Sequence, residues 1–233
     1  MEEEKTGFTS RMANWQYAAV LLYLPAHVFG LPLLLNEGID RGLVTTGMAN
    51  FWLYAFGAAL MLALLWRFLR RDFDVLCDRP FVLVMEALRC YALLWCVEIA
   101  LGLLLPVVGL QEDAESNREA VALLRAERGP MLAASVFLAP ILEESIFRAG
   151  IFGLLRRRSR ALAYAVSAFA FSLYHVWSYA LADPRQLLYV LEYLPAALLL
   201  ARCYERTNSV WGSMLLHALS NGVAIWTILR GGA

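Results

Sequence analysis

The chain has 233 residues, 61% of them hydrophobic, and its mean hydropathy of +0.58 lies outside the range of soluble proteins. We therefore expect an integral membrane protein. The formal net charge is zero, so the composition implies no bulk electrostatic attraction to nucleic acid or to acidic lipid, and no nucleic-acid partner is expected.

Apolar segments of roughly 20 residues, the length of a membrane-spanning helix, recur along the chain. They cover residues 15–35, 46–66, 81–108, 130–155, 161–182, 186–204 and 209–229. This pattern predicts an all-α, polytopic membrane helix bundle with about seven transmembrane helices around a polar intramembrane cavity. The acidic start of the chain lacks the basic region of a signal peptide, so the first span is expected to be retained.

The spans divide the chain into three predicted parts. Residues 1–110 hold about three N-terminal helices, residues 111–129 form a polar loop, and residues 130–233 hold about four helices. In the loop, Ser116 and Glu119 have the spacing of a capping box, which predicts a short amphipathic helix that would cover the bundle.

Two features of the N-terminal spans carry further expectations. Pro25 and Pro32 predict a break in the first span, and His27 between them is expected to pack with one hydrogen bond. In the third span, Glu86 and Arg89 are spaced for an intrahelical pair near one end. The deeper Glu98 is a candidate for a supporting position beside a polar site.

The Lys and Arg residues are unevenly divided between the two sides of the predicted bundle. Leaving out two arginines within spans, the N-terminus and the loops after spans two, four and six carry twelve, and the opposite side carries six. The asymmetry predicts a cytoplasmic N-terminus, with the arginines of residues 156–160 as a topology anchor. Nineteen Arg against one Lys indicates a GC-rich genome, so a bacterial inner membrane is the expected location.

The centre of the fourth span holds three charged residues, Glu143, Glu144 and Arg148. A charge at that depth costs about 2.5 to 3.5 kcal/mol, so charges that are kept there indicate a functional site. Glu144 and Arg148 lie one helical turn apart and are expected to pair, whereas Glu143 faces elsewhere and is free for chemistry. A buried structural ion pair is the alternative interpretation.

Two more polar patterns lie at a similar depth. Phe171 and His175 are spaced one turn apart in the fifth span, as are His217 and Asn221 in the seventh. At about 1.5 Å per residue, Glu143, His175, His217 and Asn221 all lie roughly 12 to 21 Å from the predicted cytoplasmic ends. Because these four side chains lie at a similar depth, one polar cavity explains them better than unrelated structural roles do.

Such a cavity suits the activation of water for peptide hydrolysis. A carboxylate can act as general base, one histidine can orient the water, and an asparagine with a second histidine can donate to an oxyanion. The chain has no GxSxG motif, no GxGD or Asp-Asp pair in a span and no HExxH, so serine, aspartyl and ordinary zinc-protease mechanisms have no support.

At these residues the sequence resembles the CPBP group (CAAX proteases and bacteriocin-processing enzymes, also called the Abi family), which is related to the Ras-converting CAAX endopeptidase. The family's EExxxR, FxxxH and HxxxN motifs are similar to residues 143–148, 171–175 and 217–221, in the same order and spacing. The resemblance covers about residues 117–229. One departure is Ala149, where the family often has glycine, which puts the local helix packing in doubt.

The resemblance implies a glutamic-type intramembrane endopeptidase without a cofactor. It implies that Glu143 and His175 activate water, that His217 and Asn221 form the oxyanion site, and that Glu144 and Arg148 hold the geometry. The implied partners are a membrane-associated protein or peptide substrate, either prenylated or C-terminally anchored, and the lipid bilayer.

Two kinds of alternative stay open. Glu143, His175 and His217 also match the ligands of a His₂Glu zinc site with water in the fourth position. The second kind of alternative is a protein that is not an enzyme. It would be a non-catalytic membrane protein, such as a bacteriocin-immunity member, or a proton-coupled carrier that uses the same buried side chains. A carrier is disfavoured because no inverted repeat is visible.

Overall fold

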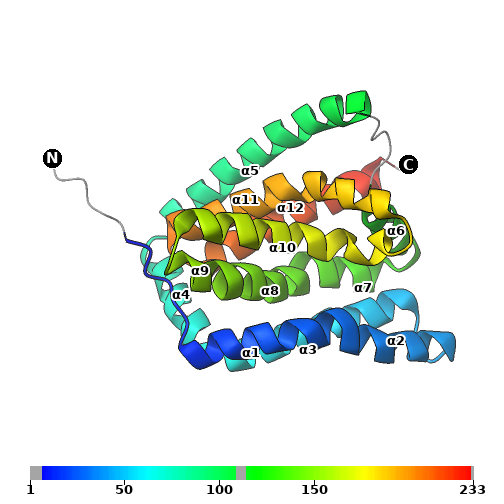
Figure 1. The fold of residues 1–233 in the computed structure, drawn as a ribbon, viewed down its shortest axis with the longest axis horizontal. Coiled ribbons are helices and arrows are strands. Elements are labelled where there is room, and N and C mark those ends of the chain that lie inside the picture. Colours follow the sequence, from blue (N-terminus) through cyan, green and yellow to red (C-terminus); the bar gives the residue numbers. More distant parts are fainter. Residues whose placement is uncertain (1–6, 109–113, 232–233) are drawn as a thin grey trace.

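The structure is a computed structural model that describes residues 7–108 and 114–231. Within these ranges every regular element is helical, so the predicted all-α class is confirmed (Figure 1). The α-helices are α1 (Asn14–Pro25), α2 (Leu31–Asp40), α3 (Thr46–Leu64), α4 (Trp66–Asp78), α5 (Pro80–Leu104), α6 (Glu115–Ala126), α7 (Arg128–Ala133), α8 (Ala139–Glu143), α9 (Gly153–Arg156), α10 (Arg160–Ala180), α11 (Val190–Thr207) and α12 (Val210–Arg230). Shorter π- or 3₁₀-helical segments cover Ala26–Gly30, Leu105–Val108, Ala134–Leu138, Glu144–Phe152 and Pro184–Tyr189.

Six stretches of the described chain are long and apolar enough to cross a membrane. They are Asn14–Asp40, Thr46–Leu64, Pro80–Val107, Arg128–Arg156, Pro184–Thr207 and Val210–Arg230. The protein is thus a polytopic membrane helix bundle. The prediction of about seven spans also included α10, a 21-residue helix that lies beside α11. Its serines, tyrosines and His175 make it less apolar than the other six.

The predicted break in the first span is confirmed. A π-helical turn over Ala26–Gly30 separates α1 from α2, and the N–H of Leu31 donates to the carbonyl of Ala26, one residue further back than in an α-helix. Because proline lacks an N–H, Pro25 and Pro32 each leave a backbone carbonyl one turn earlier without its usual helical donor. A wider turn lets other groups donate to these carbonyls. The turn places His27 inside the bundle, with 2% of its surface exposed.

The fourth span, Arg128–Arg156, is the centre of the bundle. It packs against α1 and α3 on one side and against α10 and α12 on the other (Figure 1). Pro140 at the start of α8 follows a π-helical turn, and a second π-helical segment, Glu144–Phe152, continues the span. Interruptions of this kind occur often at functional sites.

Glycine allows α1 to approach this span closely. A Cβ added to Gly150 would lie 2.9 Å from Cγ1 of Val20, which is too close. Ala149, the departure from the family motif, is itself buried at 1% exposure. The doubt that Ala149 raised is therefore resolved, because the next residue supplies the glycine that packing against α1 needs.

Helix α6 lies where the polar loop predicted a short helix, but its capping box is absent. The helix begins at Glu115, its N-cap is Ala114, and the predicted cap residue Ser116 hydrogen-bonds the hydroxyl of Tyr193 instead. Leu124 of α6 is buried. The helix therefore packs against one end of α10 and hydrogen-bonds the start of α11, as a cover would, although residues 111–113 of the predicted loop lie outside the described ranges.

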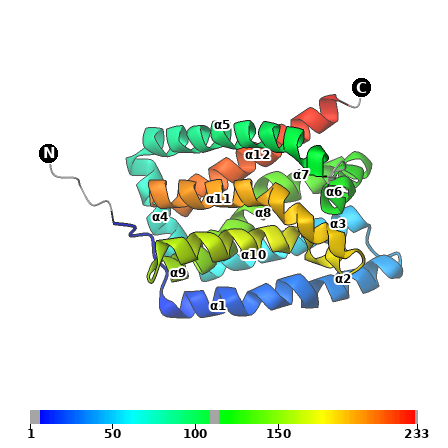
Figure 2. The same ribbon diagram turned by 45° about the horizontal axis from the view of Figure 1, so that its top comes forward.

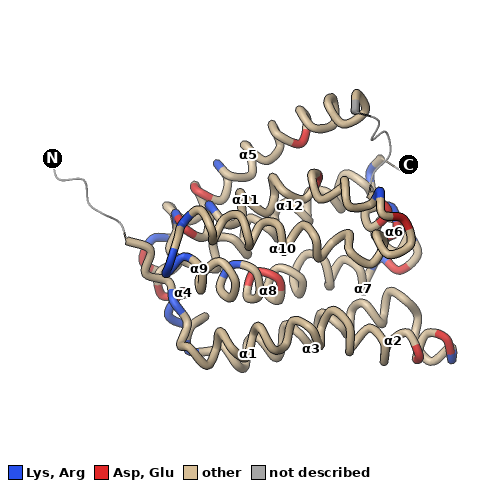
Figure 3. Tube along the Cα trace, in the orientation of Figure 1, with Lys and Arg blue, Asp and Glu red and all other residues tan. Residues whose placement is uncertain are grey.

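Charged residues gather at the two ends of the bundle, with arginines concentrated near α4, α9 and the start of α10 (Figure 3). The orientation across the membrane remains a prediction. We expect Arg158→Cys, in a variant with Cys77 and Cys96 replaced by serine, to react with an impermeant thiol reagent only from the cytoplasmic side. Leu43→Cys at the other end is the control and should react only from outside; the reverse pattern would invert the orientation.

Candidate active site

Glu143 and Glu144 meet at a junction in the central span. Glu143 is the last residue of α8, and Glu144 is the first residue of the π-helical segment that follows. Both are buried, at 3% and 0% exposure. The hydroxyl of Ser167 on α10 donates to the carbonyl of Phe147, so it supplies a partner where the helical ladder is irregular. The junction is thus held at a defined depth between α10 and α12.

Glu144 and Arg148 form the predicted pair. Arg148 Nε lies 3.2 Å from Glu144 Oε2, and both side chains are fully buried. This contact is an ion pair without an aligned hydrogen bond. Arg148 also donates from Nη2 to the carbonyl of Ala197 on α11, and its guanidinium lies 4.2 Å from the centre of the Phe171 ring. Arg148 therefore ties the central span to α10 and α11.

Glu143 faces the two predicted histidines. Its Oε2 lies 3.9 Å from Nε2 of His175 on α10 and 3.9 Å from Nε2 of His217 on α12. These distances are too long for a direct hydrogen bond, and within the described residues Oε2 has no hydrogen-bond partner. A water molecule can bridge polar atoms at such a separation. Three helices thus direct one carboxylate oxygen and two ring nitrogens at the same place.

In each of the two histidines, the hydrogen-bond partner of Nδ1 fixes the tautomer. His175 Nδ1 lies 2.9 Å from the carbonyl oxygen of Phe171, which can only accept, so Nδ1 carries the hydrogen. His217 Nδ1 lies 2.9 Å from Glu144 Oε1, and a carboxylate paired with an arginine likewise accepts. In the neutral rings, Nε2 therefore presents a lone pair toward Glu143.

Sequence analysis missed the tyrosine that holds the other oxygen of Glu143 and the polar side chains behind it. The hydroxyl of Tyr54 on α3 donates to Glu143 Oε1 at 3.1 Å, and the hydroxyl of Tyr174 lies 3.1 Å from that of Tyr54. His27 Nε2 lies 3.0 Å from the Tyr174 hydroxyl, and Nδ1 lies 3.4 Å from the hydroxyl of Tyr23. His27 thus has two polar contacts, not the single hydrogen bond predicted.

The donor and the acceptor of each hydrogen bond in this series can be assigned by starting from the carboxylate of Glu143. Each hydroxyl has one hydrogen, and Tyr54 uses its hydrogen on Glu143, so Tyr174 donates to Tyr54. Neutral His27 then donates from Nε2 to Tyr174 and accepts at Nδ1 from Tyr23. These hydrogen bonds hold Oε1 of Glu143 and leave Oε2 facing the two histidines.

We expect Tyr54→Phe to lower kcat/KM about tenfold, because one hydrogen bond to an ionised carboxylate is lost. Peptide cleavage by purified protein measures the loss. Tyr91→Phe on α5 makes the same chemical change on a helix outside the site and should leave cleavage unchanged. Equal activity in wild type and Tyr54→Phe would show that the hydrogen bond from Tyr54 to Glu143 does not contribute to cleavage.

Asn221 lies one turn beyond His217 on α12 and has a different contact. Its Nδ2 donates to the carbonyl of Ser135 at 2.8 Å, in the π-helical turn before α8. That bond uses one of the two amide hydrogens. The structure therefore brings five of the six predicted residues into one cluster and places the sixth at its edge.

Two other predictions concern α5. Glu86 and Arg89 form the predicted pair, with 3.8 Å between Oε2 and Nη1. Glu98 is exposed on α5, which diverges from the other helices along its length (Figure 1). The supporting position predicted for Glu98 is therefore wrong, because sequence depth alone does not show which way a helix leans.

The zinc alternative can be compared with the donor geometry. Two Nε2 lone pairs and a carboxylate match zinc in donor type, and each Nδ1 has the acceptor that zinc-binding histidines use. The separations of 3.9 Å from Glu143 Oε2 exceed the roughly 3.4 Å between ligands of tetrahedral zinc. Among the described residues no group of three His, Cys, Asp or Glu side chains is arranged to hold a metal ion. The residues therefore fit zinc in chemistry but not in spacing.

Comparison with known families agrees with the motifs. The model of the family described as type II CAAX prenyl endopeptidase Rce1-like matches residues 126–223, which include all six predicted site residues. No curated protein and no solved structure matched the chain. Residues 126–223 are thus similar to the Rce1-like CAAX protease family, in agreement with the resemblance of the three motifs.

Proposed function

We propose that the protein is a glutamic-type intramembrane endopeptidase in which Glu143 activates the attacking water. The family match supports intramembrane endopeptidase activity in general. The observation that carries the finer proposal is the environment of Glu143: Oε1 accepts from Tyr54, and Oε2 lies 3.9 Å from two imidazole nitrogens without a hydrogen bond of its own.

In the proposed reaction a water lies between Glu143 Oε2 and His175 Nε2. Glu143 takes a proton as the water oxygen attacks the carbonyl carbon of the peptide, and the same proton then passes to the leaving nitrogen as the C–N bond breaks. His175 orients the water through its Nε2 lone pair, because Nδ1 donates to the carbonyl of Phe171. Tyr54 holds Glu143 in position by donating to its other oxygen, Oε1.

The charge balance of the cluster suggests the role of His217. Glu143, Glu144 and Arg148 together carry one net negative charge, which is costly within a membrane. One proton on His217 neutralises the cluster, and its two N–H groups then donate to Glu144 and to the developing oxyanion. The second amide hydrogen of Asn221 is the other proposed oxyanion donor, and Glu144 with Arg148 holds His217 in place.

The proposed substrate is a peptide bond in a membrane-associated or C-terminally anchored protein, and the reaction needs no cofactor. A bilayer is the expected environment, with the bacterial inner membrane as the proposed location. To test the activity, membrane-protein termini would be compared by proteomics between cells with wild-type enzyme and cells with an inactive variant. Identical sets of termini would argue for a non-catalytic protein.

The zinc alternative makes different predictions for Asn221. If Asn221 donates to the oxyanion, Asn221→Ala should lower kcat about 10²-fold, and a strong chelator should leave wild-type cleavage unchanged. Asn50→Ala on α3, whose amide contacts Met131, is the matched control. Stoichiometric bound zinc, chelator-sensitive cleavage and a normal rate for Asn221→Ala would favour the His₂Glu site instead.

A further inference from the structure

Five arginines and two glutamates gather at one end of α5, α9, α10 and α11, outside the site described above. Arg89, Arg202 and Arg206 surround Glu86 at 3.8, 3.9 and 3.7 Å, so three cations share one carboxylate. Arg156 and Arg160 likewise share Glu205, at 2.7 and 2.9 Å. The group, called here the arginine cluster, has an excess of three positive charges.

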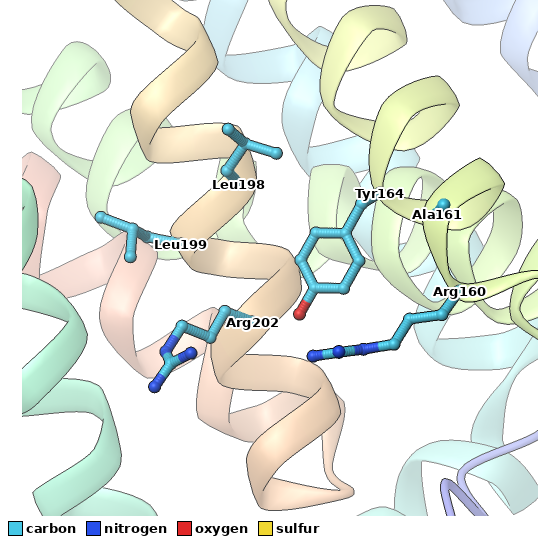
Figure 4. A pocket seen from close by; sticks show the side chains of 6 residues that line it. All are labelled: Arg160, Ala161, Tyr164, Leu198, Leu199 and Arg202. Atoms are coloured by element: carbon cyan, nitrogen blue, oxygen red, sulfur yellow. The ribbon is translucent and has the colours of Figure 1, made fainter.

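Two adjoining cavities open between these helices. The larger, of about 570 Å³, lies between α10 and α11, where Arg160 and Tyr164 reach toward Leu198 and Arg202 (Figure 4). The smaller, of about 170 Å³, lies between α11 and α5 and shares Arg202. Figure 2 shows α11 between its two neighbours, so the cavities flank one helix and form a continuous basic surface.

Each cavity combines guanidinium groups with apolar side chains. Arg160, Arg202 and Arg206 keep 63%, 47% and 60% of their side chains exposed, although each contacts a glutamate. Leu198 and Leu93, from the two cavities, are exposed hydrophobic residues. In a membrane-spanning helix, exposed leucines face acyl chains, and arginines one or two turns nearer the helix end lie at the headgroups.

We propose that this surface binds a phospholipid with an anionic headgroup, whose phosphate lies between Arg202 and Arg160 or Arg206 and whose acyl chain lies along Leu198. Basic pockets between transmembrane helices are known to suit such headgroups. Guanidinium groups favour phosphate because they donate in a planar fork. The excess of positive charge selects an anionic lipid over a zwitterionic one. The same surface is where the arginine asymmetry places the cytoplasmic leaflet.

The test is native mass spectrometry of the full-length protein after exchange into equal amounts of phosphatidylglycerol and phosphatidylcholine with identical acyl chains. We expect wild-type protein to retain phosphatidylglycerol preferentially. This part of the test uses the wild-type protein alone, so it does not depend on whether a variant folds. Each arginine near an anionic lipid surface contributes about fivefold to binding, so Arg202→Gln with Arg206→Gln should weaken retention about 25-fold. Arg202→Lys, which keeps the charge, should lose less.

Arg157→Gln with Arg158→Gln is the matched control, because it removes two positive charges at the same end of the bundle but lies outside both cavities. It should retain lipid as wild type does. Equal retention of the two lipids by wild type, or an equal loss in this control, would overturn the proposal. Displacement of the lipid by millimolar inorganic phosphate would show a simple phosphate site and would also overturn it.

Discussion

Glu143→Gln is expected to lower peptide cleavage about 10²- to 10⁴-fold while the protein stays folded and still binds substrate. Glutamine has the shape of glutamate, and its amide oxygen can still accept from Tyr54. It cannot take a proton from water, so the loss should appear in kcat with little change in KM. Cleavage of a peptide by purified protein, with thermal unfolding measured in parallel, separates these effects.

Glu98→Gln is the control for this change. It replaces a glutamate in another span, on α5, where the side chain is exposed and outside the cluster. Cleavage by Glu98→Gln should equal that of wild type. Full activity in Glu143→Gln would rule out Glu143 as the base and, with it, the proposed mechanism.

A double variant tests whether Glu143 and His175 act on one water. Their reactive atoms, Oε2 and Nε2, lie 3.9 Å apart. His175→Ala should lose nearly as much activity as Glu143→Gln, and the double variant should be little worse than either single variant. Additive losses would mean that the two residues serve separate steps.

The structure also shows which features the sequence could predict. Polar residues one turn apart within apolar segments predicted Glu143, Glu144, Arg148, His175 and His217, because buried charge is costly and helical spacing places such residues on one face. The break in the first span followed from its two prolines for a similarly local reason. Local periodicity and burial cost therefore account for most of the cluster.

Features that depend on packing between spans were not predictable in this way. Tyr54 and Tyr174 lie 120 residues apart, and the packing of α3 against α8 brings the Tyr54 hydroxyl to Glu143, where Tyr174 of α10 contacts Tyr54. Tyrosine is ordinary in an apolar span, so nothing in its local sequence marks it. The prediction for Glu98 was wrong for the opposite reason. Its depth in the sequence was suitable, but its side chain on α5 is exposed and faces away from the cluster.

Arg148→Ala should lower the free energy of unfolding by about 3 to 5 kcal/mol, because removal of one member of a buried ion pair leaves the other charge without compensation. Glu144 would then keep its hydrogen bond with His217 but lose its arginine, and the carbonyl of Ala197 would lose the Arg148 donor. We expect less folded protein as well as less cleavage. Thermal unfolding in detergent and the yield of monodisperse protein measure the first effect.

Two comparisons separate the effect of breaking the buried ion pair on stability from the effect of losing any arginine. Arg41 pairs with Glu37 at the same i,i+4 spacing but is 67% exposed, so Arg41→Ala should change stability little. Combining Glu144→Gln with Arg148→Met removes both charges and should restore part of the stability that Arg148→Ala loses. If Arg148→Ala instead kept the full stability of wild type and lost only turnover, Arg148 would act on the substrate, and the pair with Glu144 would not be what holds the central span.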